Sequence, residues 1–363
     1  MATRGLNACT HREATPPLAA AAAVPCSQRV HGDWCGCPRV SVVVPTYRRL
    51  RLLQRCLKAL EAQSIGQEAF EVLVVDDGHC ERTRHWVLAE AKRHPPGWLR
   101  YLRPEAGRGP AVARNHGWRQ ARAQLIAFTD DDTVPDEHWL LEGERAMAGG
   151  DHAGVAGRVV VPRPEGAGPA PCDHERMTRG LETASFVTAN AFVSLWALSV
   201  VQGFDERFAR AWREDSDLQF RLEALAGPLG RAERAVVQHP VRPERWGVSL
   251  RQQKNVFYDA LLYAKHPARY RRELRPRPPW DYYAIVALAL AALLFAALGQ
   301  AAVATGCALG MLGLQLALAL RRLRGASHAG GHVAEMLATS LLIPFLSVFW
   351  RLRGARRFRV WFW

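Results

Sequence analysis

Three consecutive carboxylates, Asp130, Asp131 and Asp132, are the residues of this chain best suited to chemistry. They follow an apolar run at 125–128, which predicts a buried strand. Carboxylates at the end of a strand suit Mg²⁺ or Mn²⁺, because these ions prefer oxygen ligands and leave positions open for a phosphate-bearing substrate. Asp is also common in turns and helix caps, so a solvated turn is the alternative interpretation.

Two further apolar runs, at 40–44 and 72–75, end in polar residues in the same way. Helix-like stretches at 50–62 and 82–93 separate the runs. Strands that alternate with helices predict a mainly parallel α/β sheet, and ligands of such sheets bind outside the carboxyl ends of the strands. The polar endings that would line this crevice are Pro45, Thr46 and Tyr47 after the first run, and Asp76 and Asp77 after the second.

Six short motifs occur in the order found in family 2 glycosyltransferases, which the chain resembles over residues 39–240. Each motif alone is weak, whereas the ordered set is specific. The resemblance implies a GT-A fold, a nucleotide-diphosphate sugar as donor, a divalent metal, and transfer with inversion at the anomeric carbon. The motifs are Val42-Val43-Val44-Pro45-Thr46-Tyr47, Val74-Val75-Asp76-Asp77-Gly78, Gly109-Pro110-Ala111-Val112-Ala113-Arg114-Asn115, Asp130-Asp131-Asp132, Gly203-Phe204-Asp205-Glu206 and Glu214-Asp215.

The resemblance places Asp215 at the position of the family's catalytic carboxylate. Inverting transfer needs a general base that deprotonates the acceptor hydroxyl while a metal holds the departing diphosphate. From the residues alone, the better-supported role of Asp215 is to cap the helix that follows it. Among the metal ligands Asp132 ranks first, before Asp131 and Asp130. His239 resembles a histidine that some family members add to the metal site, although a lone histidine is more often structural.

The resemblance also implies a nucleotide pocket. Asp76 would hydrogen-bond the base, Asp130 would contact the ribose, and Arg114 would contact phosphate near a helix N-terminus. The ordinary alternative for Arg114 is a surface salt bridge. The residues that would shape the base pocket are Pro45, Thr46 and Tyr47.

The acceptor would meet a second group of polar residues. The Gln-x-x-Arg-Trp motif of polymer-forming synthases is missing from the chain, so we expect transfer of a single sugar to a hydroxyl of a polyprenyl-linked or other lipid-linked acceptor. No motif specifies which sugar, nucleotide or acceptor is used. The residues of the acceptor region are Asn190, Asp205, Glu206 and Glu214.

A formal net charge of +14 in 363 residues raises the question of a nucleic-acid partner. The sequence has neither zinc-finger spacing nor a basic helix-turn-helix pattern. Arginines instead cluster beside apolar stretches near the C-terminus, where anionic lipid headgroups attract them. We therefore expect membrane lipids, and not nucleic acid, as partners. Residues 1–38 lack a signal-peptide core and are expected to be a poorly ordered extension, which leaves the catalytic domain cytoplasmic.

Residues 280–363 are expected to form a membrane region. Its first part, 282–320, carries no charge and would measure about 58 Å as one helix, roughly twice the hydrocarbon core. This length predicts two spans, at 282–298 and 301–320. Flanking arginines place both outer ends in the cytoplasm, which predicts a multi-pass protein of the inner membrane.

Two other segments of the C-terminal region are ambiguous. The connector, 241–279, contains a helical pattern at 249–265 that would either lie in the headgroup plane or pack on the catalytic domain. The apolar stretch 333–350 contains Glu335 and Pro344, so we expect a re-entrant or in-plane segment rather than a third span.

Together these features predict a membrane-attached, metal-dependent inverting glycosyltransferase that uses Mg²⁺ or Mn²⁺. A nucleotidyltransferase, which would have a related acidic metal site, is one alternative. A non-catalytic membrane scaffold that retains the fold is another, although a scaffold has no need of Asp130, Asp132 and Asp215 together.

Overall fold

The computed structural model describes residues 37–163, 166, 168 and 170–362, so the expected N-terminal extension lies almost wholly outside it. An eight-stranded mixed sheet has the order β3-β2-β1-β4-β7-β6-β8-β5. Its strands are β1 (Val40–Thr46), β2 (Phe70–Asp76), β3 (Leu99–Leu102), β4 (Leu125–Thr129), β5 (Val134–Pro135), β6 (Gly154–Val160), β7 (Asn190–Ser194) and β8 (Leu229–Gln238).

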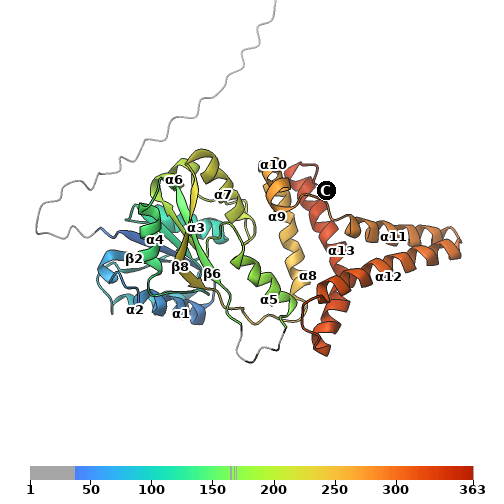
Figure 1. Cartoon of the computed structure of the whole chain (residues 1–363), viewed down its shortest axis with the longest axis horizontal. Coiled ribbons are helices and arrows are strands. Elements are labelled where there is room, and N and C mark those ends of the chain that lie inside the picture. The colour runs from blue at the N-terminus through green and yellow to red at the C-terminus, as the bar shows by residue number, and fades with distance from the viewer. Residues whose placement is uncertain (1–36, 164–165, 167, 169, 363) are drawn as a thin grey trace, which may run out of the picture. The chain divides into compact units, whose positions relative to one another are not determined.

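Helices cover both faces of this sheet (Figure 1). Alternate residues of a strand point to opposite faces, so Val42 and Val44 of β1 pack into one core cluster and Val43 into another. Apolar residues on both faces make β1 and β2 near-continuous aliphatic runs, as expected for buried parallel strands. The first cluster includes α1 (Leu50–Glu61), α2 (Glu81–Ala91) and α4 (Trp139–Ala148); the second includes α3 (Pro110–Arg119), α6 (Leu195–Val201) and α7 (Glu214–Leu225).

The strand directions bring the predicted polar endings to one edge of the sheet. Strands β3, β2, β1 and β4 are mutually parallel, and Thr46 pairs with Asp76 in the register of β1 and β2. Strand β7 runs antiparallel to β4, so its first residue, Asn190, pairs with Thr129. The mainly parallel α/β sheet is therefore confirmed, and the carboxyl ends of β1, β2 and β4 meet at the same edge.

The connector forms short helices that pack on the catalytic domain. Helix α9 (Val256–Lys265) contributes Leu261 and Leu262 to a cluster with Phe208 and Phe220 of the catalytic domain and Phe362 near the C-terminus. This packing favours the second of the two expected arrangements for the connector. Its elements are α8 (Val248–Gln252), α9 (Val256–Lys265), α10 (Pro267–Arg269) and a π-helical turn, Tyr270–Leu274.

Three long helices complete the chain: α11 (Trp280–Ala297), α12 (Ala301–Leu323) and α13 (Gly330–Phe358). Gly299, with a φ of 73°, makes the turn between α11 and α12. These two helices lie side by side and project away from the sheet (Figure 1). By length and composition alone, each of the three helices is apolar enough to cross a membrane.

Polar contacts tie these helices to the rest of the chain. The Arg322 guanidinium, at the end of α12, donates to Asp173 at 2.7 Å and to the hydroxyl of Thr339 in α13 at 2.7 Å. The backbone N–H of Gly247 donates to Glu335 of α13 at 2.6 Å. Asp173 begins α5 (Asp173–Thr178), which precedes β7 in the catalytic domain.

Candidate active site

Asp130, Asp132 and His239 form the centre of the site. One potential ligand atom from each residue lies within 4.8 Å of those of the other two. Asp130 and Asp132 follow β4, and His239 directly follows β8, so two strands of one sheet deliver the three groups. Asp132 and His239 are buried and Asp130 is partly exposed. The structure thus brings together three of the four predicted metal ligands.

Asp131 points away from this cluster. Its Oδ2 accepts a hydrogen bond from the Thr46 hydroxyl at 2.7 Å, and its Oδ1 lies 3.5 Å from Arg49 Nη1. Burial and the neighbouring charge of Asp132 raise the pKa of Asp131 to about 6. Asp132 therefore faces the histidine, and Asp131 faces the end of β1.

The donor set fits a divalent cation. Two carboxylates and an imidazole suit Mn²⁺ and related ions. The His239 Nε2 lies 3.5 Å from Asp132 Oδ1, while its Nδ1 is buried without a hydrogen-bond partner in the described structure. Burial would raise the pKa of Asp130, but Arg114, His239 and Arg242 lower it on balance, so Asp130 stays ionised.

Arg114 connects the group of Asp130, Asp132 and His239 to α7. It is buried, and its guanidinium lies 2.8 Å from Asp130 Oδ1 and 3.2 Å from Glu214 Oε1. Arg114 thus forms salt bridges, as its alternative interpretation holds, but they are enclosed and do not lie at the surface. Burial and Asp215 raise the pKa of Glu214 to about 8, against the lowering effect of Arg114.

Asp215 lies in the first turn of α7, next to Glu214. Its Oδ1 accepts a hydrogen bond from the Thr188 hydroxyl at 2.7 Å, and its Oδ2 lies 3.4 Å from the Thr188 backbone nitrogen. The residue that caps α7 is Arg213, which has a φ of 74°. The helix-cap interpretation of Asp215 is therefore wrong. Burial raises the pKa of Asp215 above its usual value in spite of the opposing charge of Arg114.

The predicted base pocket is only partly assembled. Asp76 is fully buried, and its carboxylate already accepts hydrogen bonds from the backbone of Gly78 and Cys80 and from the Tyr101 hydroxyl. It thus holds the loop after β2. Of the other predicted residues, Tyr47 is 47% exposed, Pro45 is partly exposed, and Thr46 is buried against Asp131.

Asn190 does not face an acceptor. It is fully buried, its side-chain oxygen accepts from Trp139 Nε1 at 2.8 Å, and its amide nitrogen donates to the carbonyls of Arg158 and Ala235. The prediction that Asn190 contacts the acceptor is corrected, because every polar atom of this side chain is used to join β6, β8 and α4. Glu214 is likewise enclosed, with 2% exposure.

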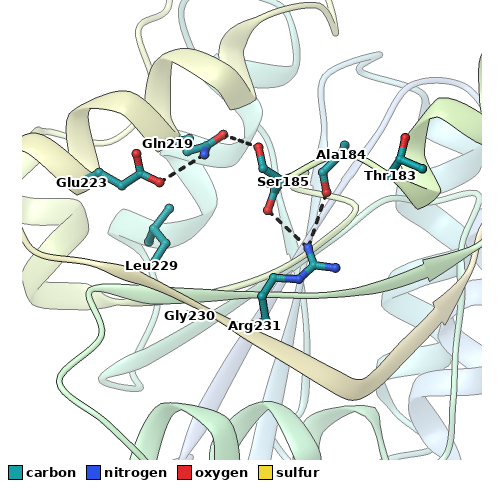
Figure 2. A pocket seen from close by; sticks show the side chains of 8 residues that line it. All are labelled: Thr183, Ala184, Ser185, Gln219, Glu223, Leu229, Gly230 and Arg231. Carbon is teal, nitrogen blue, oxygen red and sulfur yellow. Dashed lines mark hydrogen bonds between the residues drawn. The ribbon is translucent and has the colours of Figure 1, made fainter. Parts of the chain in front are cut away.

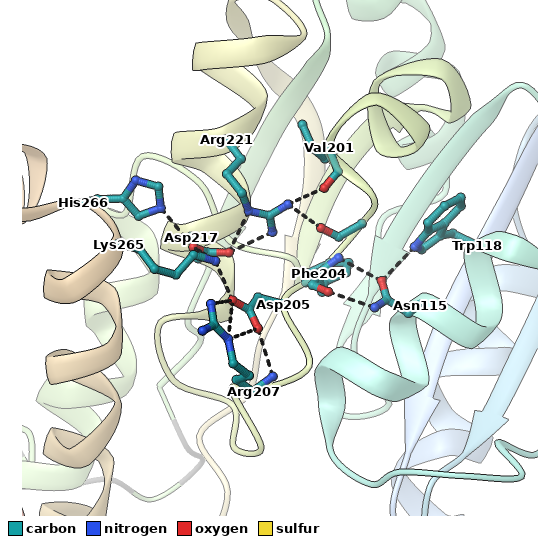
Figure 3. A network of polar contacts seen from close by, with 11 residues as sticks. Asn115, Trp118, Val201, Phe204, Asp205, Arg207, Asp217, Arg221, Lys265 and His266 are labelled. Carbon is teal, nitrogen blue, oxygen red and sulfur yellow. Dashed lines mark hydrogen bonds and ion pairs between the residues drawn. The ribbon is translucent and has the colours of Figure 1, made fainter. Parts of the chain in front are cut away.

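Asp205 belongs to a separate polar network (Figure 3). Lys265 of α9 lies 2.6 Å from both Asp205 and the buried Asp217 of α7, and His266 contacts Asp217 at 3.0 Å. The network holds α7 against the connector. Glu206, also predicted for the acceptor region, is exposed and accepts from Asn115 at 2.8 Å.

Two partners of the site were missed in the sequence. Arg242 Nε lies 3.0 Å from Asp132 Oδ2, and Thr188 holds Asp215. Arg242 follows His239 by three residues in a proline-rich segment, which gives no periodic signal. Thr188 begins the segment 188–192 that the resemblance assigns to the acceptor region, but only the folded chain shows that it contacts Asp215.

A hollow elsewhere in the domain contains none of the predicted site residues. It has a volume of about 270 Å³ and lies between α7 and the start of β8, where Ser185 donates to Gln219 (Figure 2). Gln219 is one helical turn beyond Asp215. The residues that line the hollow are Thr183, Ala184, Ser185, Gln219, Glu223, Leu229, Gly230 and Arg231.

Sequence comparisons identify the family. Residues 41–195 match the profile of glycosyl transferase family 2, and residues 125–351 match that of glycosyl transferase family group 2. The chain is a family 2 glycosyltransferase. This membership confirms the predicted enzyme class and favours a glycosyltransferase over the nucleotidyltransferase.

Two curated relatives illustrate the breadth of this glycosyltransferase family. Validoxylamine A glucosyltransferase of Streptomyces hygroscopicus subsp. jinggangensis is 30% identical over 250 residues, 58% of this chain and 55% of the relative. GalNAc(5)-diNAcBac-PP-undecaprenol beta-1,3-glucosyltransferase of Campylobacter jejuni is 30% identical over 95 residues, 26% of this chain and 30% of the relative. The chain thus spans about half or less of the length of these relatives.

A solved structure supports the fold of the glycosyltransferase. The mannosyltransferase PcManGT from Pyrobaculum calidifontis, in complex with GDP-Man and Mn²⁺, has a TM-score of 0.57 and 20% identity, with 87% of each chain covered. This similarity confirms the GT-A fold.

Proposed function

We propose that this glycosyltransferase moves one sugar from a nucleotide-diphosphate sugar to a hydroxyl of a lipid-linked acceptor, with inversion at the anomeric carbon. The observation that carries the proposal is that a candidate metal site and a buried carboxylate, Asp215, lie close together at one edge of the sheet. Asp130, Asp132 and His239 lie within ligand-sharing distance, and Arg114 connects Asp130 to the helix turn that bears Asp215.

In this mechanism Asp130, Asp132 and His239 would hold Mg²⁺ or Mn²⁺. The cation would supply charge neutralisation for the departing diphosphate. The complex of PcManGT with GDP-Man and Mn²⁺ supports this choice of donor class and metal. Arg242, which contacts Asp132, is placed to add a further positive charge at the same position.

Asp215 acts as the general base on the acceptor hydroxyl. Its carboxylate accepts the hydroxyl proton as the acceptor oxygen attacks the anomeric carbon and the bond to the diphosphate breaks. Thr188 fixes the orientation of the carboxylate through the 2.7 Å hydrogen bond. The raised pKa of Asp215 increases its capacity to hold the proton during the transfer.

A lipid-linked acceptor fits the rest of the chain. The undecaprenol-linked acceptor named for the Campylobacter relative supports this substrate class. We infer that α11 and α12 enter the membrane as a hairpin, whereas α13 lies at its surface. Both ends of α13 contact the connector. Near its start, Glu335 accepts a hydrogen bond from the backbone N–H of Gly247. Near its end, Gly354 packs so closely on α9 that an added Cβ would lie 2.7 Å from the Phe257 carbonyl oxygen.

Purified full-length protein should identify the donor directly. We expect one nucleotide-diphosphate sugar from a panel to raise the melting temperature only when Mn²⁺ or Mg²⁺ is present, with slow release of nucleoside diphosphate. Release of pyrophosphate, or stabilisation that is independent of metal, would contradict the proposal. A matched sample with excess chelator is the control.

Reporter fusions test the membrane arrangement. Fusions after Arg324 and after Trp363 should both be active only as cytoplasmic reporters, because α11 and α12 return the chain to its starting side and α13 does not cross. A periplasmic signal after Arg324 would overturn the hairpin. A periplasmic signal after Trp363 alone would show that α13 is a third span.

A further inference from the structure

A second cluster of potential metal ligands lies away from the catalytic edge. Glu61 ends α1, Glu90 lies in α2, and His94 follows α2 on the way to β3. One ligand atom from each residue lies within 4.8 Å of those of the other two. Because α1 and α2 return from the carboxyl ends of their strands, their C-terminal ends lie at the opposite edge of the sheet. The reaction proposed for Asp215 does not use this cluster.

His94 is a nearly buried side chain that faces two carboxylates. Its side chain is only 10% exposed, and its Nε2 is buried without a hydrogen-bond partner in the described structure. The Nδ1 lies 3.1 Å from Gln67 Oε1, an amide oxygen that can only accept, so the tautomer that satisfies this contact has its proton on Nδ1. In the neutral imidazole, the lone pair of Nε2 then faces carboxylate oxygens of Glu61 at 3.4 Å and Glu90 at 3.5 Å.

These separations match the edges of a tetrahedral metal site. Zinc binds nitrogen and carboxylate oxygen at about 2.0–2.2 Å, so two ligands of a tetrahedral zinc ion lie roughly 3.4 Å apart. Gln67 would orient the histidine, as an outer hydrogen bond commonly does for a ligating imidazole. We propose that Glu61, Glu90 and His94 bind Zn²⁺ and join the ends of α1 and α2.

The competing explanation is a protonated imidazole paired with both glutamates. Arg93 already lies 3.3 Å from both carboxylate oxygens of Glu90, but its side chain is 74% exposed and so compensates the charge weakly. The two explanations differ in whether the cluster needs a metal, and therefore in metal stoichiometry.

Metal counting on the full-length protein in detergent separates them. All variants carry Asp132→Ala, which weakens the catalytic site and simplifies the count. After chelation and dialysis against Zn²⁺, the parent should retain one more Zn²⁺ per chain than either His94→Ala or Glu90→Gln. Zn²⁺ should also raise the melting temperature of the parent, but not of these variants, by on the order of 5 °C.

A matched control comes from the same helix. His85 lies 3.9 Å from Glu81 on the exposed face of α2, so His85→Ala should keep both the extra Zn²⁺ and the thermal shift. Tetrahedral Co²⁺ absorption in the parent, lost in Glu90→Gln, would confirm the ligand set. Equal Zn²⁺ content and equal shifts in the parent, His94→Ala and Glu90→Gln would overturn the site and leave the protonated imidazole.

Discussion

Two acidic runs meet at the active site, and they distribute their carboxylates differently. After β4, a turn brings Asp130 and Asp132 toward His239 and sends Asp131 to Thr46. At the start of α7, helical rotation directs each carboxylate to a different partner. These pairs are Glu214 with Arg114, Asp215 with Thr188, and Asp217 with Lys265.

The difference separates two chemical tasks. A turn that gathers alternate carboxylates can share one multivalent cation. A helix rotates successive side chains by about 100°, so it can present one carboxylate to the substrate while its neighbours are enclosed. We therefore expect the first run to bind the donor through metal and the second to supply a single base.

The largest effect should come from Asp215→Asn. This substitution keeps the size of the side chain but removes the basic carboxylate, so single-turnover transfer should fall by on the order of 10²-fold or more. Nucleotide-sugar affinity should remain, because the proposed donor contacts lie on other residues. Transfer rate and donor affinity are measured on the same preparation.

Thr188→Val provides the matched control for that measurement. It removes the hydroxyl that orients Asp215 but keeps the carboxylate, so the rate should fall less than in Asp215→Asn. A wild-type transfer rate in Asp215→Asn would contradict the assignment of Asp215 as the general base. Equal losses in donor affinity and turnover would show that Asp215 belongs to donor binding instead.

The next effect should distinguish two neighbouring aspartates. Asp132→Ala removes a proposed metal ligand and should weaken metal-dependent nucleotide binding by about 10²-fold, whereas Asp131→Asn, which can still accept from Thr46, should weaken it less than tenfold. Calorimetric titration of nucleotide with and without Mn²⁺ gives both values. Equal losses of nucleotide affinity in the two variants would show that Asp131 and Asp132 do not have the different roles described.

The smallest effect on transfer should come from Asp217→Asn. Its burial against Lys265, His266 and Arg221 predicts a loss of unfolding free energy of about 3 kcal/mol, with a transfer rate close to that of the wild type. Thermal unfolding and single-turnover transfer measure the two quantities. A rate loss as large as that of Asp215→Asn would break the distinction between the two positions.

Acidification should reduce this stability difference. Burial opposes ionisation of Asp217, but His266, Arg221 and Lys265 hold its pKa below the usual value. A group with a lowered folded-state pKa stabilises the fold above its unfolded pKa of about 3.9, and this stabilisation is lost as the pH falls below it. Unfolding curves of wild type and Asp217→Asn should therefore converge toward low pH.

The sequence predicted those parts of the molecule that depend on local pattern. Aliphatic runs ending in polar residues predicted the strands and the shared edge, because strand polarity follows from the alternation with helices. The uncharged stretch interrupted at Gly299 predicted a helical hairpin, and α11 and α12 occupy that stretch.

Side-chain destinations could not be predicted in the same way. Asn190 was expected near the acceptor, yet hydrogen bonds with Trp139, Arg158 and Ala235, distant in sequence, enclose it. The turn after Thr129, rather than the order of residues, determines which aspartates face His239. Such choices depend on contacts between distant segments, and a single sequence carries no periodic signal for them.

The contacts of Arg322 bear on how far the enzyme reaches. This arginine joins α12 directly to Asp173 of the catalytic domain and to Thr339 of α13, so the catalytic domain is packed against the C-terminal helices. We expect the working height of the active site above the bilayer to be set by rigid packing. The distance between the lipid anchor of an acceptor and its reactive hydroxyl would then have to match this height. The fold would therefore select acceptors by that distance.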